Sequence, residues 1–282
     1  MKRAAIYSLL LLYLLSSCLT FRKSDQRIST KFEQVGTQAK IQKVATLGGE
    51  LRYFSAGELS ATKPTVLFIH GAPRSGMDFF DYLADKELQV QANLIALDRL
   101  GYGHSAYGKA EVSISAQARA IAKIIEEHQL TKVILFGWSY GVPIAVKLAH
   151  EEPAIVSSLL VAGAISPADE KFFFLGKLVH WKATRWLFSK ALRVADEEKS
   201  NHVTALTGLL PIWGTLQTPI LYYHGTKDKI VPFENMNFIK RQVSSSILTA
   251  EAIEGANHFV AFTHYARVKA SLLGLIEEVK KE

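Results

Sequence analysis

The sequence contains almost no cysteine: among its 282 residues there is a single one, Cys18. One thiol cannot form a disulfide within the chain, and it cannot supply a metal site built from several cysteine ligands. The rest of the composition is ordinary, with 49% hydrophobic and 21% charged residues, which excludes a disordered, collagen-like or coiled-coil chain. We therefore expect a globular domain with a sizeable core, in which the lone cysteine has another role.

A long apolar run is also missing. The longest one, residues 4–15, is twelve residues long, whereas a membrane-spanning helix needs about 20. Lys2 and Arg3 precede this run, and a short basic segment followed by a short apolar one is typical of a secretory signal peptide. The sequence therefore predicts a signal peptide over residues 1–17.

Cys18 closes this segment, directly after Leu15, Ser16 and Ser17. The order resembles the lipobox of bacterial lipoproteins, which implies cleavage before Cys18 and attachment of lipid to its thiol. The protein would then be lipid-anchored in the bacterial cell envelope. Leu19 stands where some bacteria place an inner-membrane retention Asp, which favours the outer membrane. A plain signal peptide and an uncleaved anchor remain alternatives.

The basic charge is modest once the predicted signal is removed. Lys plus Arg is 33 and Asp plus Glu is 26, a net charge of +7, and loss of Lys2 and Arg3 leaves 31 − 26 = +5. No nucleic-acid-binding motif accompanies it, so no nucleic-acid partner is expected. Residues 18–45 are polar and are predicted to be a lipidated N-terminus and linker. Its basic residues could touch anionic lipid or belong to a solvated tether. These residues are Arg22, Lys23, Arg27 and Lys31.

Residues 46–282 show short apolar runs that alternate with helical patterns. The runs lack in/out alternation, which is typical of strands buried on both faces of a parallel sheet. They cover residues 65–69, 93–97, 132–136, 158–162, 219–223 and 247–253. Helical spacing covers residues 115–128, 142–151 and 269–280. This alternation predicts the α/β class, with a mostly parallel, doubly wound sheet. Residues 166–218 break the rhythm and are predicted to be a small helical cap.

One predicted strand runs directly into a G-x-S-x-G sequence, Gly137-Trp138-Ser139-Tyr140-Gly141, and a helical pattern follows. A serine in such a strand-to-helix turn has a strained backbone, which lifts its Oγ out at the sheet edge. The glycines two residues away on either side avoid a collision. The pattern predicts that Ser139 is a nucleophile; the alternative is a tight turn with an inert serine.

Three further segments follow predicted strands. The first strand ends in His70-Gly71-Ala72-Pro73, and the next is followed by a D-x-x-G-x-G-x-S turn over residues 98–105. Asp228 and His258 each come after a later strand. The carboxyl ends of strands in an open α/β sheet are where ligands and chemistry meet.

Taken together, these motifs resemble those of the α/β-hydrolase fold, from about Leu51 to the C-terminus. The resemblance implies a catalytic triad in the order Ser139, Asp228, His258, with His258 as general base and Asp228 orienting it. It also implies an oxyanion hole made by the backbone N–H groups of Ala72 and Tyr140. His70 is then expected to have a structural role, and the glycines of the D-x-x-G-x-G-x-S turn to supply unusual φ angles.

The implied activity is acyl transfer from a small or medium carboxylic ester to water, with no metal and no organic cofactor. Ser139 argues against the epoxide hydrolases and haloalkane dehalogenases of this fold, which use Asp as nucleophile. Trp138 and Phe259 are expected near the substrate pocket. Two alternatives stay open: an aminopeptidase or amidase on the same triad, and a catalytically idle lipoprotein that binds a ligand. The sequence does not indicate an oligomeric state.

The predicted cap is rich in aromatic residues. Residues 171–193 also carry six Lys/Arg and no acidic residue, which suggests a lid that faces lipid. On a helical wheel, however, its basic and apolar residues do not separate cleanly. A cap with an ordinary core of its own is the alternative.

Overall fold

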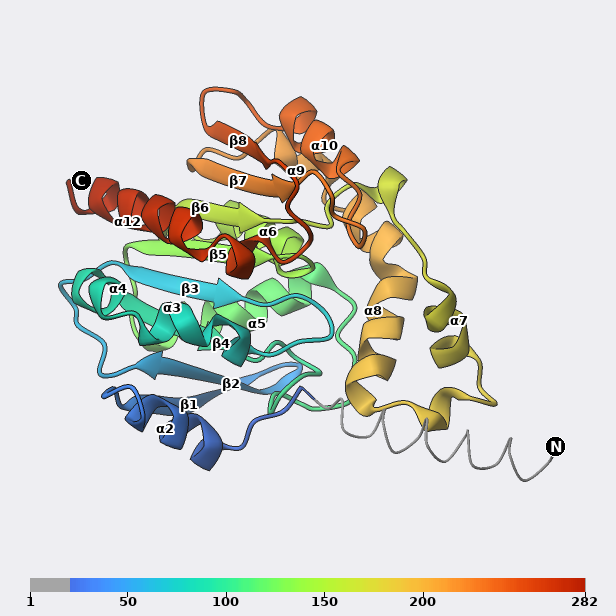
Figure 1. Ribbon diagram of the computed structural model, residues 1–282, viewed down its shortest axis with the longest axis horizontal. Helices are drawn as coiled ribbons and strands as arrows, with labels where there is room; N and C mark the ends of the chain where they lie inside the picture. Colours follow the sequence, from blue (N-terminus) through green and yellow to red (C-terminus); the bar gives the residue numbers. More distant parts are fainter. Residues whose placement is uncertain (1–20, 282) are drawn as a thin grey trace.

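An eight-stranded sheet forms the centre of the protein in the computed structural model, which describes residues 21–281 apart from the side chain of Leu175. The strand order is β1-β2-β4-β3-β5-β6-β7-β8, in which β1, β2 and β4 pair antiparallel and the remaining pairs are parallel (Figure 1). The strands are β1 (Ala39–Thr46), β2 (Gly49–Ala56), β3 (Thr65–Ile69), β4 (Asn93–Leu97), β5 (Val133–Trp138), β6 (Ile155–Val161), β7 (Ile220–Gly225) and β8 (Leu248–Ile253).

The predicted mostly parallel α/β sheet is confirmed, and each of the six predicted strands is present with shifts of at most three residues at its ends. The central strands are buried on both faces, which explains their unbroken apolar sequences. In β3, Val66 and Phe68 face one side of the sheet, while Leu67 and Ile69 face the other. The two sides form separate hydrophobic clusters.

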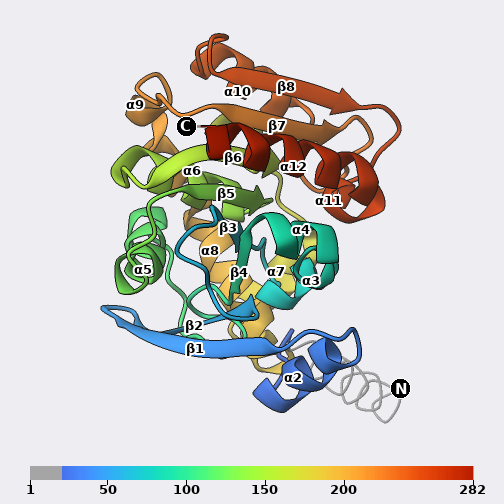
Figure 2. The ribbon, with the colours of Figure 1, turned by 90° about the vertical axis from the view of Figure 1, so that its left-hand side faces the viewer.

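Helices cover both faces of the sheet, as the two opposite layers in Figure 2 show. One face carries α5 (Ile114–Glu127), α6 (Gly141–Glu151), α9 (Leu210–Trp213) and α10 (Glu234–Gln242). The other carries α2 (Asp25–Glu33), α3 (Phe80–Ala84), α4 (Lys86–Gln91), α11 (Val260–Thr263) and α12 (Tyr265–Lys281). The three helices expected from periodicity are present; α12 begins four residues before its predicted start. Within residues 21–281, no helix is long and apolar enough to cross a membrane.

Residues 166–218 contain helices and no strand. They form the short turns η2 (Pro167–Asp169) and η3 (Arg185–Leu187), the helices α7 (Phe174–His180) and α8 (Lys190–Thr207), and α9. Figure 1 shows α7 and α8 standing beyond the arrowheads of the central strands. This cap therefore lies over the sheet edge at which the parallel strands end.

The predicted linker over residues 18–45 is wrong for the part that the structure describes, residues 21–45. Within it, α2 buries Ile28 and Phe32 completely, and β1 pairs with β2 along eight residues. The sequence signal is weak because α2 has few apolar residues and β1 is an edge strand, half exposed to solvent.

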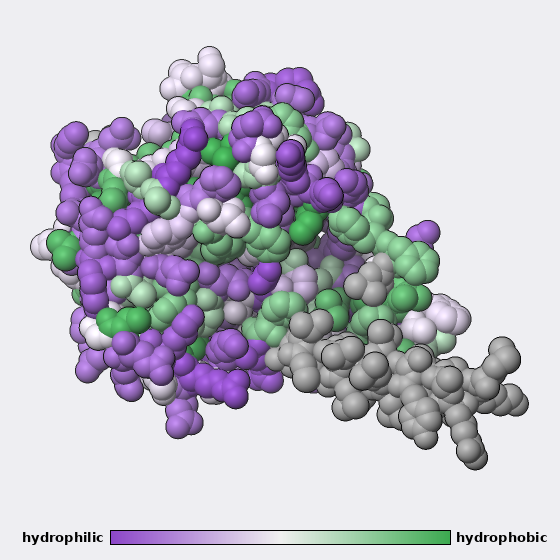
Figure 3. Space-filling view, viewed as in Figure 1, coloured by the Kyte–Doolittle hydropathy of each residue, from purple (hydrophilic) through white to green (hydrophobic). Residues whose placement is uncertain are grey.

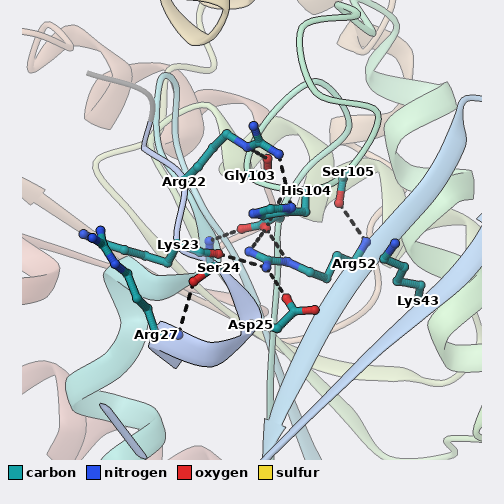
Figure 4. A network of polar contacts seen from close by, with 12 residues as sticks. Arg22, Lys23, Ser24, Asp25, Arg27, Lys43, Arg52, Gly103, His104 and Ser105 are labelled. Atoms are coloured by element: carbon teal, nitrogen blue, oxygen red, sulfur yellow. Dashed lines mark hydrogen bonds and ion pairs between the residues drawn. The ribbon is translucent and has the colours of Figure 1, made fainter. Parts of the chain in front are cut away.

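Partly buried polar contacts also hold the start of this segment on the domain (Figure 4). Arg22 donates from Nε to the carbonyl oxygen of Gly103 at 2.8 Å. Arg52, fully buried in β2, donates to the carbonyl oxygen of Lys23 at 3.0 Å and to Oδ1 of Asp25 at 2.6 Å. Residues 22–25 are therefore part of the folded domain.

Candidate active site

Ser139 occupies a sharp turn between β5 and α6. Its φ of +56° lies in the left-handed region, which costs free energy for a residue with a side chain. A Cβ on Gly137 would lie 3.1 Å from the Cβ of Ala145, and one on Gly141 would lie 2.2 Å from the carbonyl oxygen of Ile69. A side chain at position 141 would thus overlap the backbone, and one at position 137 would be in tight contact, as the motif predicts.

The structure brings Ser139, His258 and Asp228 together, although they lie on three separate loops. Nε2 of His258 is 3.0 Å from Oγ of Ser139, and Nδ1 of His258 is 2.7 Å from Oδ2 of Asp228. All three residues are largely buried. This geometry allows a serine hydroxyl to pass its proton to an imidazole whose other nitrogen is held by a carboxylate.

The loop after β7 holds Asp228 in its ionised form. Its Oδ1 accepts hydrogen bonds from the backbone N–H groups of Ile230 at 2.8 Å and Val231 at 2.9 Å. Burial opposes ionisation of Asp228, but the contact with His258 and the two N–H donors outweigh it, so its pKa lies below the ordinary value. Asp228 is therefore a carboxylate at neutral pH.

Trp138 and Phe259 lie beside His258, and neither is among the residues that line the cavity at Ser139. Trp138 is buried, and its Nε1 donates to the carbonyl oxygen of His258 at 3.2 Å. Its ring lies 5.5 Å from the His258 ring and 5.7 Å from the Phe259 ring. Trp138 therefore packs against the loop that carries the base.

The predicted oxyanion-hole residues adjoin Ser139. Ala72 and Tyr140 line the same cavity as Ser139. A Cβ on Gly71 would lie only 2.8 Å from the Cβ of Ser139, so the Gly71–Ala72 peptide passes directly beside the nucleophile. An N–H donor at this place can reach an oxygen that gains negative charge as Ser139 attacks a carbonyl.

His70 has the structural role that the sequence suggests. Burial, together with the nearby Arg99 charge, holds the pKa of His70 well below its usual range, so the ring is neutral. Its Nε2 accepts from the backbone N–H of Arg99 at 2.9 Å, and its Nδ1 lies 2.6 Å from the carbonyl oxygen of Gly71. His70 thus fixes the peptide that carries the N–H of Ala72.

A buried ion pair, not foreseen from the sequence, joins this loop to the cap. Arg99 donates to the carbonyl oxygens of His70 at 2.9 Å and Gly71 at 3.2 Å, and to Oε1 of Glu198 in α8 at 2.6 Å. Arg99 and Glu198 are both fully buried. The one sequence signal is helical phase, because Glu198 falls on the buried stripe of α8 formed by residues 191, 194, 198, 202 and 206.

The glycines of the D-x-x-G-x-G-x-S turn adopt the unusual φ angles that are expected from the sequence. Gly101 and Gly103 have φ angles of +90° and +51°. A Cβ on Gly103 would overlap the Asp98 carboxylate, which accepts hydrogen bonds from Arg52 at 2.9 Å and from the backbone N–H of Gly76 at 3.1 Å. The turn therefore packs around the buried Asp98 carboxylate.

A cavity of about 880 Å³ extends from Ser139 beneath the cap. Its wall is mostly apolar, with Val179, Leu192 and Ala195 from the cap helices. Of its acidic side chains, Glu170 is paired with Lys199 and His202, and these contacts lower its pKa although burial opposes ionisation. The cavity suits an apolar ligand.

A second feature not foreseen from the sequence is the His202 ring, which stacks on the Tyr140 ring with 4.5 Å between the ring centroids.

Cys18 and the signal over residues 1–17 lie outside the described residues. Among residues 21–281, no group of three or more His, Cys, Asp or Glu side chains is placed to hold a metal ion.

Comparisons with known proteins also point to the alpha/beta hydrolase fold. A family model described as alpha/beta hydrolase fold matches residues 64–191, a stretch that includes Ser139. The AB hydrolase superfamily protein YisY of Bacillus subtilis (strain 168) is 25% identical over 229 residues, covering 69% of this chain and 85% of its own.

Solved structures of similar shape include a membrane phospholipase A, described as a novel bacterial virulence factor. It has a TM-score of 0.67 and 18% identity, and the match covers all of both chains. An esterase from Exiguobacterium antarcticum has a TM-score of 0.63 and 18% identity, over 84% of this chain and 99% of its own. At these identities the likeness concerns the fold alone.

Proposed function

Since the chain has the alpha/beta hydrolase fold, we propose that it is a serine hydrolase that cleaves carboxylic esters through Ser139, His258 and Asp228. The observation that carries the proposal is the hydrogen-bonded order of these three residues, 3.0 Å from serine to histidine and 2.7 Å from histidine to aspartate. A serine hydroxyl is a poor nucleophile at neutral pH and needs such a base.

The reaction proceeds in two acyl transfers. Oγ of Ser139 attacks the ester carbonyl carbon while its proton moves to Nε2 of His258, and the N–H groups of Ala72 and Tyr140 stabilise the oxyanion. His258 then gives the proton to the departing alcohol, which leaves an acyl-enzyme. Water, activated by the same histidine, releases the acid and restores Ser139. Asp228 holds His258 in the required tautomer throughout.

The cavity supports an ester with an apolar acyl group. Its lining is mostly apolar, and an acyl chain can bury itself there beside Ser139. Glu170 and Asp196, two of its carboxylates, are already paired with Lys199 and Arg185, which leaves them poorly suited to hold a substrate amine. Asp169, the third carboxylate of the lining, accepts a hydrogen bond from Oγ of Ser166, and it is the mostly apolar wall that favours esters over the aminopeptidase alternative.

Lipid attachment at Cys18 is a second proposal, supported by the Leu-Ser-Ser-Cys order at the end of the apolar segment. It would keep the enzyme on a membrane of the bacterial cell envelope, with the outer membrane favoured by Leu19. Replacing Cys18 by Ser should abolish incorporation of labelled palmitate and release the protein from the membrane fraction. Labelled palmitate in the variant would contradict the proposal.

A substrate panel tests the proposed activity. We expect the protein to hydrolyse p-nitrophenyl esters of graded acyl length and to leave aminoacyl arylamides intact. Ser139→Ala should lower ester hydrolysis by roughly 10⁴-fold or more. Ser245→Ala, an exposed serine far from the triad in sequence, is the matched control and should not change it. Faster cleavage of the arylamides would assign the site to a peptidase or amidase.

A further inference from the structure

An exposed cluster of large aromatic side chains covers the outer edge of the cap. We call this cluster the cap edge; its members and their exposed fractions are Phe172 (62%), Phe173 (47%), Phe174 (73%), Trp181 (60%) and Trp186 (59%). Figure 3 shows hydrophobic side chains gathered over α7 at the right-hand margin of the molecule. Contiguous apolar surface of this kind on a folded domain marks an interaction site.

These aromatic residues are not the core of the cap. The cap has its own small cluster of buried side chains, Val179, Leu187 and Phe188. The cap edge points away from that cluster to solvent, so burial within the cap does not explain it. Each exposed ring costs free energy in water, and covering it on an apolar partner removes that cost.

The cavity that contains Ser139 opens at the cap edge. Phe172, Phe173 and Trp181 line the cavity and are at the same time about half exposed or more. An apolar path therefore runs from the outer surface of the cap to the nucleophile. A ligand held by the cap edge would enter the cavity without crossing bulk water.

Positive charge accompanies the aromatic rings. Residues 171–193 carry six Lys/Arg and no acidic residue; Arg185 is paired with Asp196 and Glu197 of α8, whereas Lys171, Lys177 and Lys182 are exposed. Aromatic rings that insert at the acyl boundary, beside lysines that reach phosphate groups, are the chemistry of a segment lying on an anionic bilayer. On a helical wheel, the basic and apolar residues of this segment do not separate. In the structure, Val179, Leu187 and Phe188 are buried, whereas the aromatic rings of the cap edge are exposed.

The start of the described chain lies on the same side of the molecule. Phe21 packs against the small cluster formed by Tyr102 and by Ala191 and Val194 of α8, and in Figure 1 the described chain begins near the lower end of that helix. Arg74 lies 5.8 Å from its ring. Cys18 precedes Phe21 by three residues in the sequence. A lipid on Cys18 would therefore hold the cap side toward the membrane.

We propose that the cap edge docks on an anionic phospholipid bilayer and that the ester cleaved at Ser139 belongs to an acyl lipid drawn from that bilayer. The proposal rests on the proposed serine hydrolase activity and names its substrate class. Cleavage would convert the lipid ester into a free fatty acid and the corresponding alcohol-bearing lipid, with water as the co-reactant.

The test uses the full chain carrying Cys18→Ser, so that no acyl chain is attached, and adds Phe174→Ser with Trp186→Ser. Neither of these two residues lines the cavity. The matched control is Leu47→Ser with Val90→Ser, which are exposed by 104% and 66% on other elements. Each protein is assayed for sedimentation with phosphatidylcholine vesicles, with and without phosphatidylglycerol. Hydrolysis is measured on the vesicle phospholipid and on soluble p-nitrophenyl butyrate.

We expect the cap-edge variant to lose roughly tenfold or more in both binding to the phosphatidylglycerol vesicles and hydrolysis of their lipid. Hydrolysis of the soluble ester should stay unchanged, and the control should match the parent protein in every assay. Equal binding and hydrolysis of the phosphatidylglycerol vesicles by the parent and the cap-edge variant would overturn the proposal. A parent protein that is dimeric and binds no vesicles, together with a cap-edge variant that is monomeric, would also overturn it. A parent protein that hydrolyses neither the vesicle phospholipid nor p-nitrophenyl butyrate would instead refute the proposed function.

Discussion

Glu198 carries the buried negative charge that joins the cap to the oxyanion loop, and Glu198→Gln removes that charge while keeping the size of the side chain. Its carboxylate accepts from Arg99 at 2.6 Å, from the Tyr102 hydroxyl at 2.6 Å and from Nε2 of Gln117 at 2.9 Å. All of its partners are donors. The new amide NH₂ would therefore face another donor, and the Arg99 guanidinium would be left buried without a counter-charge.

The expected loss of stability is about 3–5 kcal/mol, the cost of breaking a buried ion pair from one side. Glu126→Gln is the control, because Glu126 pairs with Lys123 on the surface, where both side chains are about half exposed or more. An exposed pair contributes about 0–1 kcal/mol. Urea unfolding of the two variants measures both values. A loss no larger for Glu198→Gln than for Glu126→Gln would refute the reasoning.

The same substitution also tests whether Glu198 positions the oxyanion hole. Arg99 donates to the carbonyl oxygen of Gly71, and this carbonyl shares a peptide unit with the N–H of Ala72. A shift of Arg99 would turn that N–H away from the reacting oxygen, so kcat for a soluble ester should fall roughly tenfold to a hundredfold while KM changes less. Unchanged kcat in the folded variant would show that the ion pair stabilises the fold and nothing more.

Three other substitutions probe separate parts of the structure. Phe32→Ala should cost about 3–5 kcal/mol in urea unfolding, because the ring is fully buried under α2, whereas Val35→Ala should cost less than about 0.5 kcal/mol. Burial raises the pKa of Asp78 from 3.8 to about 6, so the folded state holds that proton more tightly than the unfolded state and the free energy of unfolding falls as the pH rises through this window. Asp78→Asn removes this loss, so its stability relative to the parent protein, measured by urea unfolding, should be up to about 3 kcal/mol higher at pH 8 than at pH 4. Asp228→Asn should lower kcat by roughly 10⁴-fold with little change in fold, as measured by ester hydrolysis and circular dichroism.

The central strands and Ser139 could be predicted because each depends on local sequence. A strand buried on both faces has an unbroken apolar run, and the turn at Ser139 carries glycine at two fixed positions, at both of which the structure is tightly packed. Asp228 and His258 are predicted from the resemblance to the α/β-hydrolase fold together with their positions after strand ends, and the structure places both within hydrogen-bond distance of their partners.

Features that depend on distant contacts could not be predicted in the same way. The contact of Arg99 with Glu198 joins residues 99 apart in the sequence, and Glu198 follows two other acidic residues in a helix that looks solvent-facing. The strand β1 is half exposed and gains its pairing from β2, so its own residues carry little signal. Trp138 adjoins the nucleophile in sequence, but its side chain points to the loop of His258, a direction that sequence order does not reveal.

The central claim is that Ser139 is a nucleophile activated by His258, and a fluorophosphonate probe tests it most directly. The account predicts one probe molecule per chain, attached to the peptide that contains Ser139, no label on Ser139→Ala, and much slower labelling of His258→Ala. Folded protein that takes up no probe, or that takes it up at another serine, would contradict it.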